Sequence, residues 1–396
     1  MRVAIVAFSP VSQDGRVLRT AHALHKHGHD VHLVGYGAPP SCCPAHFHSL
    51  GSPPTRAAHW TWVLVGYAPA NLSPSLTKFL APLRPLHRHC YDILRNLRPD
   101  VIHANDWPVL PVAVMVKTAT GARIVYDSHE FAREEHATKS LWRLLYRAHV
   151  CATEAAGLLE ADRVVTVSPG IARLLKKTYQ LAREPTVILN VPSHQAMATH
   201  AVGQRLELLY HGLMMAGRGL ETLIMAVGQL RRPARLVLRG NGKSSYIDDL
   251  RRLAANHTDS GRVVFEPAVP FKEVIRVAAH ADIGLFTPPI ATSQTRYMLP
   301  NKLFEYLMAG LMVIFSSGDD VVEIIRQHGC GIILSDVSAS SLAGAIESLE
   351  PNEISQFKDR ALKAARLLCW ESEGSKLAGL YAELDRNRQT PIADAI

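Results

Sequence analysis

Lys302 and Glu305 lie three residues apart in the stretch of this sequence that is best suited to bind a phosphate-bearing ligand. The apolar pattern predicts a helix that starts at Pro300 and ends before Gly310, with Asn301 in its first turn. Side chains three and four residues apart share one helical face. A helix start attracts phosphate, and a carboxylate one turn deeper can accept hydrogen bonds from both ribose hydroxyls. An ordinary amphipathic helix with Lys302 and Glu305 facing water would show the same pattern.

Further groups in the second half of the chain suit the same kind of ligand. Arg218 ends a glycine-bearing loop, and its guanidinium fork matches phosphate oxygens. Loops 239–242 and 266–269, which contain Asn241 and Val269, can flank a planar base. One phosphate-bearing nucleotide would satisfy all of these groups together.

Histidines and carboxylates near the ends of expected strands in the first half can supply the chemistry. Parallel strands end at one edge of a sheet, where open α/β sheets bind ligands. We expect His129 and Glu130 to be functional. His103 can equally be a loop histidine with a structural hydrogen bond, and Asp14 and Asp106 can be helix caps. The polar residues at these strand ends are Asp14, Gly15, Arg16, His103, Asn105, Asp106, Asp127, His129 and Glu130.

The composition indicates a globular protein of two domains. A chain of 396 residues is too long for one compact core, and 47% of the residues are hydrophobic while 20% are charged. The net charge of +8 suits phosphate-bearing ligands or an anionic membrane surface. The sequence contains no long basic run and no basic helix of the kind that would indicate binding of nucleic acid.

The cysteines and the apolar runs indicate the compartment. Six cysteines have no metal-ligand spacing and are expected to be reduced thiols of a cytoplasmic protein. The N-terminal residues predict a buried strand rather than a cleavable signal, and no apolar run approaches the ~18 residues that span a bilayer. The adjacent pairs Asp248-Asp249 and Asp319-Asp320 are expected to be helix-end carboxylates. No metal and no other cofactor is expected.

Residues 38–90 depart from the regular alternation of strands and helices. Their aromatic and basic side chains can form a surface that lies on a membrane interface. The alternative is a strand from Trp60 to Val65 and a core-packed helix after a loop. The aromatic and basic residues are Trp60, Trp62, Tyr67, Lys78, Phe79, Arg84 and Arg88.

Six motifs in order make nearly the full chain resemble glycosyltransferase family 4, a group of retaining sugar-nucleotide transferases. Each motif alone is weak evidence, whereas six at the family's spacing are strong evidence. The motifs are Asp14-Gly15-Arg16, His103-Ala104-Asn105-Asp106, Tyr126-Asp127-Ser128-His129-Glu130, Arg218-Gly219-Leu220, Asp282-Ile283-Gly284-Leu285, and Pro300 to Tyr306 with Gly310.

The resemblance implies an α/β protein with the GT-B fold, in which two Rossmann-like domains face each other across a cleft. Residues 1–192 are expected to form the N-terminal, acceptor-binding domain. Residues 204–370 are expected to form the C-terminal domain, which binds a UDP- or GDP-sugar donor. A C-terminal helix at about 371–390 is expected to cross back to the N-terminal domain. Residues 191–200 show neither helical nor strand periodicity, which indicates the linker between the domains.

The resemblance also implies roles for individual residues. Arg218 matches the diphosphate-binding cation, Glu305 the ribose ligand, and His129 the histidine beside the donor sugar's anomeric carbon. Two positions depart from the family pattern: Tyr297 replaces the first motif glutamate, and Leu213 replaces a second phosphate-binding arginine. Lys302 is then the companion cation. The expected catalytic residues are His129, Glu130, Arg218 and Lys302, and the expected substrate-binding residues are Glu305, Asn301, Gly15, Arg16, Asp106, Asn241 and Val269.

The resulting prediction is a retaining hexosyltransferase of polysaccharide or glycoconjugate biosynthesis. Its acceptor is a glycan or a lipid-linked molecule, and the protein is cytoplasmic, with an anionic membrane surface as a further partner. Two alternatives remain open on the same fold. One is a sugar-nucleotide epimerase, and the other is a nucleotide-sugar-binding protein without catalysis, which the missing glutamate at Tyr297 favours.

Overall fold

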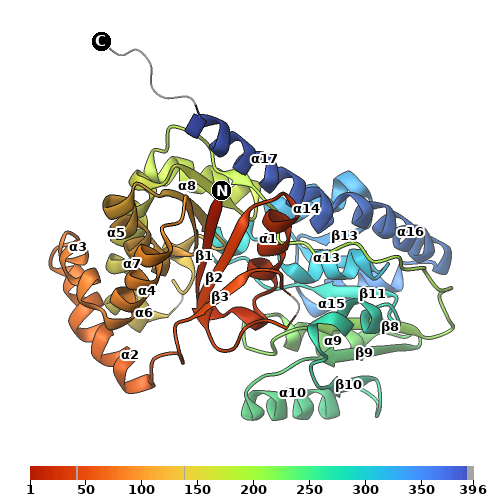
Figure 1. Ribbon diagram of the computed structural model, residues 1–396. Helices are drawn as coiled ribbons and strands as arrows, with labels where there is room; N and C mark the ends of the chain where they lie inside the picture. The colour runs from red at the N-terminus through yellow and green to blue at the C-terminus, as the bar shows by residue number, and fades with distance from the viewer. Residues whose placement is uncertain (42, 138, 390–396) are drawn as a thin grey trace. The chain divides into compact units, whose positions relative to one another are not determined.

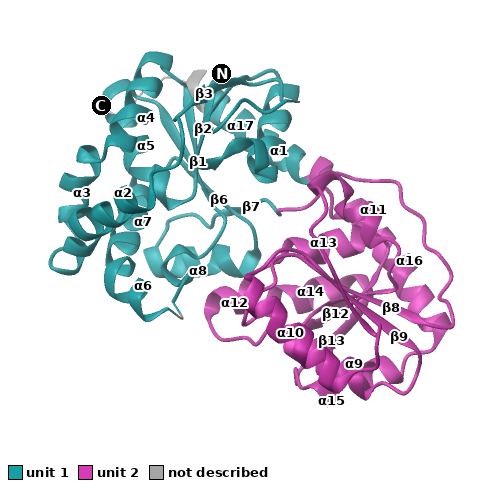
Figure 2. Ribbon diagram, turned by 90° about the horizontal axis from the view of Figure 1, so that it is seen from below, with its two compact units in different colours: residues 1–189, 373–396 teal, residues 190–372 magenta. Residues whose placement is uncertain are grey.

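The chain divides into two units, each built on its own parallel sheet (Figure 2). The computed structural model describes residues 1–41, 43–137 and 139–389. Unit 1 contains residues 1–189 and the end of the chain from residue 373, and unit 2 contains residues 190–372. The boundaries expected from the sequence were residue 192 and residues 370–371.

Unit 1 is a doubly wound α/β domain (Figure 1). Within the described residues its sheet has seven parallel strands in the order β3-β2-β1-β4-β5-β6-β7. The order reverses between β1 and β4, where Val6 pairs with both Val34 and Ala104. Ligands of open α/β sheets bind at such a reversal, outside the carboxyl ends of the strands. With η for 3-10 and π turns, the elements are β1 Arg2–Pro10, η1 Val11–Gln13, α1 Gly15–Lys26, β2 Asp30–Tyr36, β3 His46–Ser49, α2 Arg56–Trp62, η2 Val63–Tyr67, η3 Ala68–Asn71, α3 Leu76–Leu80, η4 Ala81–Leu83, α4 Pro85–Leu97, β4 Val101–Asn105, η5 Trp107–Val109, α5 Leu110–Thr120, β5 Arg123–Ser128, η6 Ala132–Glu134, α6 Ser140–Leu145, α7 Arg147–Glu160, β6 Arg163–Thr166, α8 Pro169–Tyr179 and β7 Thr186–Val187.

Unit 2 repeats the same plan. Its described residues form six parallel strands in the order β10-β9-β8-β11-β12-β13, with the reversal between β8 and β11. The central strands are apolar and buried on both faces, as parallel sheets require. The elements are β8 Leu206–His211, α9 Leu220–Gln229, β9 Ala234–Arg239, α10 Ser244–His257, β10 Val263–Glu266, η7 Phe271–Glu273, α11 Val274–Ala278, β11 Ile283–Phe286, α12 Ser293–Tyr297, α13 Asn301–Met308, β12 Met312–Ser316, α14 Asp319–His328, β13 Gly331–Leu334, α15 Ala339–Glu347 and α16 Pro351–Leu367.

The C-terminal helix α17, Trp370–Gln389, returns to unit 1. The hydroxyl of Tyr381 lies 2.9 Å from Nδ1 of His103 on β4, and Glu373 accepts a hydrogen bond from the backbone of Leu189 at 2.9 Å. Arg123 also donates to the carbonyl of Leu384. The helix therefore closes unit 1 and fixes one of its central histidines.

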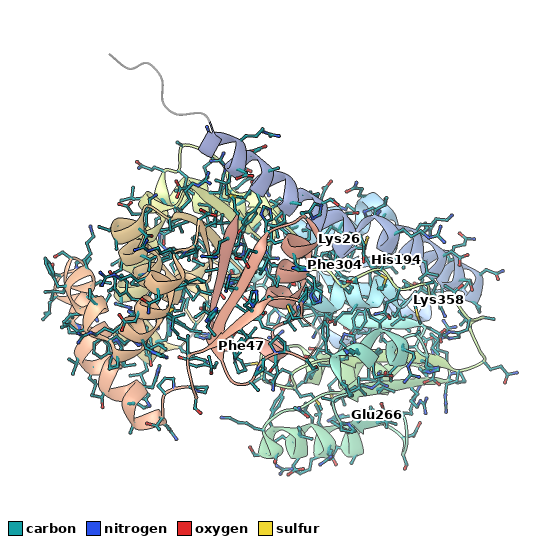
Figure 3. The ribbon with its side chains drawn as sticks, viewed as in Figure 1. Lys26, Phe47, His194, Glu266, Phe304 and Lys358 are labelled. Atoms are coloured by element: carbon teal, nitrogen blue, oxygen red, sulfur yellow. The ribbon has the colours of Figure 1, made fainter. Side chains whose placement is uncertain are left out.

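A buried ion pair fixes the amino end of β11 in unit 2. Lys358 of α16, labelled in Figure 3, lies 2.9 Å from Asp282, and both side chains are buried. Asp282 also accepts the backbone N–H of Glu207 at 3.0 Å. The Asp282 motif of the sequence is therefore structural.

The structure corrects the prediction of a strand from Trp60 to Val65. These residues belong to α2 and η2, and Thr55 caps α2 by accepting the backbone N–H of Ala58. A Cβ on Gly66 would lie 2.7 Å from the Trp62 ring, so the helical turn packs the ring directly over the glycine. The aromatic and β-branched composition favours a strand, but packing between residues four apart decides for the helix.

Smaller differences concern helix boundaries. The helix expected to start at Pro300 is α13, which starts at Asn301 and has Pro300 as its N-cap. Asp319 and Asp320 lie in the first turn of α14, as expected, whereas Asp248 and Asp249 lie in the second turn of α10 and pair with arginines.

Five cysteines among the described residues are free thiols, and Cys42 lies outside those residues. Throughout residues 1–41, 43–137 and 139–389, every helix is too short or too polar to traverse a bilayer.

Candidate functional site

Unit 2 contains a cavity of about 330 Å³ at the carboxyl ends of β8 and β9. The loops that follow these strands touch, because the backbone N–H of Gly212 donates to the carbonyl of Arg239 at 2.9 Å. A Cβ on Gly240 would lie 1.8 Å from the carbonyl oxygen of Gly212, so this approach requires glycine. The cavity lining also includes Leu213, Asn241, Ala268, Val269, Val274 and Glu305.

Beside this cavity lies a buried ammonium group without a counter-ion. The Nζ atom of Lys302 is 3.9 Å from the ring centre of Tyr210 and 4.1 Å from that of Phe286. Among the described residues Lys302 forms no hydrogen bond or ion pair. Burial lowers its pKa well below the usual value, the charge of Arg218 lowers it further, and Glu305 opposes the shift. Because an uncompensated buried charge costs free energy, the position favours binding of an anion.

Arg218 lies near the same aromatic ring as Lys302. Its guanidinium carbon is 5.9 Å from the ring centre of Phe286, and within the described chain it has no carboxylate partner. The Oγ1 atom of Thr287 is buried nearby without a hydrogen-bond partner, and a Cβ on Gly219 would lie 3.4 Å from it. Two cations and one hydroxyl donor are thus gathered around Phe286 and the start of α9.

The carboxylate of Glu305 is fixed in the cavity wall by a histidine. Its Oε2 lies 2.7 Å from Nε2 of His211, whose backbone N–H donates to the hydroxyl of Tyr306 at 3.0 Å. Arg239 is held in a similar way, because two of its guanidinium nitrogens donate to Oε2 of Glu266. Nδ1 of His211 and Nη1 of Arg239 remain buried without partners. The cavity wall therefore holds one fixed carboxylate, and two buried nitrogens of residues in the lining have no hydrogen-bond partner.

Unit 1 carries a second polar cluster, centred on Asp127 at the end of β5. Two nitrogens of Arg16 donate to its two carboxylate oxygens, each at 2.8 Å, and Nε2 of His103 lies 3.2 Å from Oδ2. The remaining terminal nitrogen of Arg16 donates to the carbonyl of Ile188 at 2.9 Å. Burial alone would raise the pKa of Asp127, but Arg16 and His129 outweigh it and hold this pKa well below its usual range.

His129 bridges Asp106 and Asp127. Its Nδ1 lies 3.2 Å from Oδ2 of Asp106, and its backbone N–H donates to Oδ1 of the same residue at 3.1 Å. Its Nε2 lies 3.3 Å from Oδ2 of Asp127 without hydrogen-bond geometry, so the contact is ionic and Nε2 has no hydrogen-bond partner. Burial lowers the pKa of His129, but the two carboxylates outweigh it and raise this pKa to about 10. The imidazole is therefore a permanent cation at neutral pH and no proton acceptor.

The backbone of Asp106 is strained. Its φ of 61° with ψ of 163° is a conformation that side chains other than glycine rarely adopt. The backbone N–H of Asp106 donates to the carbonyl of Asp127 at 2.9 Å, which ties the end of β4 to β5. Strain of this kind, which costs about 1–3 kcal/mol, is typical of functional sites.

A cavity of about 560 Å³ lies next to this cluster and shares Asp106 with it. Glu130 and Glu135 add two carboxylates to the lining, and burial raises the pKa of Glu135. The rest of the lining is mostly aromatic. It includes His59, Trp60, Trp107, His136, Lys139, Leu141, Trp142 and Tyr146.

The family follows from two matches that together cover most of the chain. Residues 15–191 match the glycosyl transferase 4-like domain, and residues 205–352 match the glycosyl transferases group 1 domain. The chain is a group 1 glycosyltransferase. No curated protein sequence matches it significantly. The family predicted from the six sequence motifs is confirmed.

The fold of this glycosyltransferase is GT-B, as predicted. Sucrose-phosphate synthase from Thermosynechococcus elongatus matches with a TM-score of 0.71 at 15% identity, covering 98% of this chain and 100% of that chain. HepE of Anabaena in complex with UDP-glucose matches with a TM-score of 0.71 at 14% identity, covering 97% and 100%. The α,α-trehalose 6-phosphate synthase of Burkholderia multivorans matches with a TM-score of 0.68 at 12% identity, covering 98% and 99%. At these identities the likeness is one of fold.

In unit 2 most of the predicted site residues of the glycosyltransferase lie together. Glu305, Asn241 and Val269 line one cavity. Nζ of Lys302 would lie 3.5 Å from a Cβ on Gly212 of the same lining, and Arg218 lies near the Phe286 ring that Lys302 contacts. Asn301 does not join them. Its side chain is exposed and accepts a hydrogen bond from Asn190 at 3.0 Å.

In unit 1 the structure changes several expectations. Asp106 does not cap a helix through its side chain but contacts His129, and His103 lies within β4 rather than in a loop. Asp14 does cap α1, and Gly15 is the first residue of that helix. Arg16, expected to bind substrate, has its guanidinium occupied by Asp127 and Ile188. Glu130 lines the aromatic cavity rather than the Asp127 cluster.

Sequence reasoning missed His211 and Thr287 and placed Arg239 only in a loop beside the base, although all three have unpartnered polar atoms around the unit 2 cavity. Each lies at the end of a strand or directly after it, the same signal that identified His129. Within the described part of the chain, no group of three or more His, Cys, Asp or Glu side chains is arranged to hold a metal ion.

Replacing His129 with Gln should change the pH dependence of stability. The pKa of His129 is about 10 in the folded state against 6.5 for the ordinary side chain. Its charge therefore stabilises the fold fully below the unfolded pKa, and this contribution is lost as pH rises through the folded pKa. Urea denaturation of both proteins should show a free-energy difference that shrinks from pH 6 to pH 10. A difference that is constant over this range would contradict the assignment of a protonated imidazole.

Proposed function

We propose that this glycosyltransferase transfers a hexose from a UDP- or GDP-sugar to a glycan or lipid-linked acceptor with retention of configuration, in the biosynthesis of a polysaccharide or glycoconjugate. The observation that carries the proposal is the pair of cations, Lys302 and Arg218, without carboxylate partners in the described residues. The adjoining cavity of about 330 Å³ falls within the range of small-ligand pockets.

The proposed donor is bound in three parts. Lys302 and Arg218 hold the diphosphate, with the Thr287 hydroxyl as a further donor. Glu305, held by His211, accepts hydrogen bonds from the ribose hydroxyls. The base lies in the remaining cavity, against the apolar wall that includes Val269. HepE, for which structures in complex with UDP and with UDP-glucose are known, has the same fold and supports the choice of a nucleotide-sugar.

The proposed reaction breaks the bond between the anomeric carbon and a diphosphate oxygen. The acceptor hydroxyl attacks the anomeric carbon from the face that the diphosphate leaves, and its proton passes to a diphosphate oxygen. Negative charge grows on the leaving group, so Lys302 and Arg218 stabilise the transition state more than the ground state. His129 cannot act as the base, because two carboxylates keep it protonated. The protonated imidazole instead acts on the donor sugar, as the histidine that it resembles in the family does, and positions that sugar.

The aromatic cavity of unit 1 is the proposed acceptor site. Aromatic faces such as that of Trp142 suit the apolar face of a sugar ring, and carboxylates accept hydrogen bonds from its hydroxyls. Asp106, Glu130 and Glu135 make the cavity unfavourable for a phosphorylated sugar, because like charges repel. An uncharged sugar is therefore the acceptor group that this lining favours.

Replacing Glu305 with Ala should weaken nucleoside diphosphate binding by about 1.5–3 kcal/mol, the range for a charged hydrogen-bond acceptor. Calorimetry with UDP and with GDP measures the effect and shows which base is preferred. Glu207→Ala is a matched control, because Glu207 lies in the same strand as His211 but pairs with Arg205 and Arg235 instead. Equal affinities of the Glu305 variant and wild type would remove Glu305 from the site.

Replacing His129 with Ala should lower turnover by about 10²-fold, the scale for losing one preorganised group. Affinity for the nucleoside diphosphate alone should be unchanged, because that ligand lacks the sugar that His129 contacts. The melting temperature is measured on the same preparation. A loss of activity that only follows the unfolded fraction, or normal turnover in a folded variant, would contradict the proposed role.

A further inference from the structure

The exposed apolar side chains of unit 1 are concentrated at one end of it. Of the thirteen large hydrophobic side chains that the described residues expose, seven belong to residues 64–83 and to α6. The elements that carry them pack together, and Asn71 donates to the carbonyl of Leu144 at 2.7 Å. Figures 1 and 2 both show α2, α3 and α6 at the same end of the unit. We call this surface the apolar face, and its members are Leu64, Val65, Leu72, Phe79, Leu83, Leu141 and Leu144.

Every formal charge on the elements of the apolar face is positive. The sequence has no Asp or Glu between Asp30 and Asp92, and none between Glu135 and Glu154. The exposed cations of these two acid-free segments are Arg56, Lys78, Arg88, Lys139, Arg143 and Arg147.

We propose that the apolar face binds the surface of a bilayer that contains anionic lipids. Leucine and phenylalanine side chains are stabilised at the boundary between headgroups and acyl chains, and nearby Lys and Arg side chains are attracted to anionic headgroups. Exposed apolar side chains that cluster in this way mark an interaction site. A second copy of the chain is a poor occupant, because a two-fold interface would set the same cations against each other.

The apolar face adjoins the aromatic cavity of unit 1. Leu141 belongs to the face and also lines that cavity, as does Trp142 from the same helix. A bilayer bound at the face would therefore lie next to the proposed acceptor site. This inference about the acceptor rests on the proposed function. Of the two proposed acceptors, a glycan or a lipid-linked molecule, it selects a sugar carried on a lipid anchor.

Co-sedimentation of the full-length protein with vesicles tests the proposal. Vesicles of phosphatidylcholine with a quarter of phosphatidylglycerol should bind the protein at low salt. Binding should be at least tenfold weaker in 0.5 M salt and on pure phosphatidylcholine, because the attraction of cations to the headgroups is screened or absent.

A matched pair of variants tests whether the apolar face is the surface that binds the vesicles. Leu144 of the apolar face and Leu367 of unit 2 are each 65% exposed, so Leu144→Asp and Leu367→Asp make the same chemical change at equal exposure. Leu144→Asp should lower vesicle binding at least tenfold, whereas Leu367→Asp should lower it only by the small effect of one added charge. Melting temperature and nucleotide affinity of both variants verify the fold of each unit.

Three outcomes would overturn the proposal: no binding to anionic vesicles, equal binding of the two variants, or a dimer in light scattering that Leu144→Asp dissociates without any vesicle binding by wild type. The last result would identify a second copy as the occupant. Transfer to a water-soluble acceptor sugar is measured in parallel. If transfer persists while vesicle binding fails, the proposed function stands and only the bilayer surface is wrong.

Discussion

The proposed function depends on one buried ammonium group of unit 2 that has no counter-ion among the described residues. Lys302 lies between the rings of Tyr210 and Phe286, which belong to the strands β8 and β11 on either side of the sheet reversal. Cation–π attraction compensates only part of the cost of removing a charge from water. The remainder makes an anion the natural partner, and Arg218 adds a second charge beside it. The unpartnered atoms of His211, Arg239 and Thr287 are further groups left for a ligand.

In unit 1, by contrast, the buried carboxylate of Asp127 is compensated by cations of the same unit. Asp127 is held by Arg16, His103 and His129, and His103 is in turn held by Tyr381 of the returning helix α17. The packing of the last helix therefore extends through His103 to the central carboxylate. This network keeps His129 protonated, because its two ring nitrogens face the carboxylates of Asp106 and Asp127.

Much of the fold was predictable from the sequence, since alternating strands and helices and six ordered motifs pointed to two Rossmann-like units. The common face of Lys302 and Glu305 followed from helical periodicity. The burial of Lys302 could not be predicted in this way, because the rings that flank it come from strands distant in sequence. The contact between Glu305 and His211 could not be predicted for the same reason. Nor could the contacts of Arg16, whose partners Asp127 and Ile188 meet it only in the folded sheet. The helix over residues 56–67 was missed because local composition favours a strand.

Replacing Lys302 with Met tests the account most directly, because it predicts opposite effects on stability and binding. Met has a similar length and no charge, so removal of the uncompensated ammonium should raise the melting temperature of the ligand-free protein. The same change should weaken nucleoside diphosphate binding by tenfold or more, as measured by calorimetry. Lys272→Met, which removes an exposed lysine of unit 2, is the control for net charge. A Lys302→Met variant that melts at a lower temperature and binds the nucleotide with unchanged affinity would contradict the account.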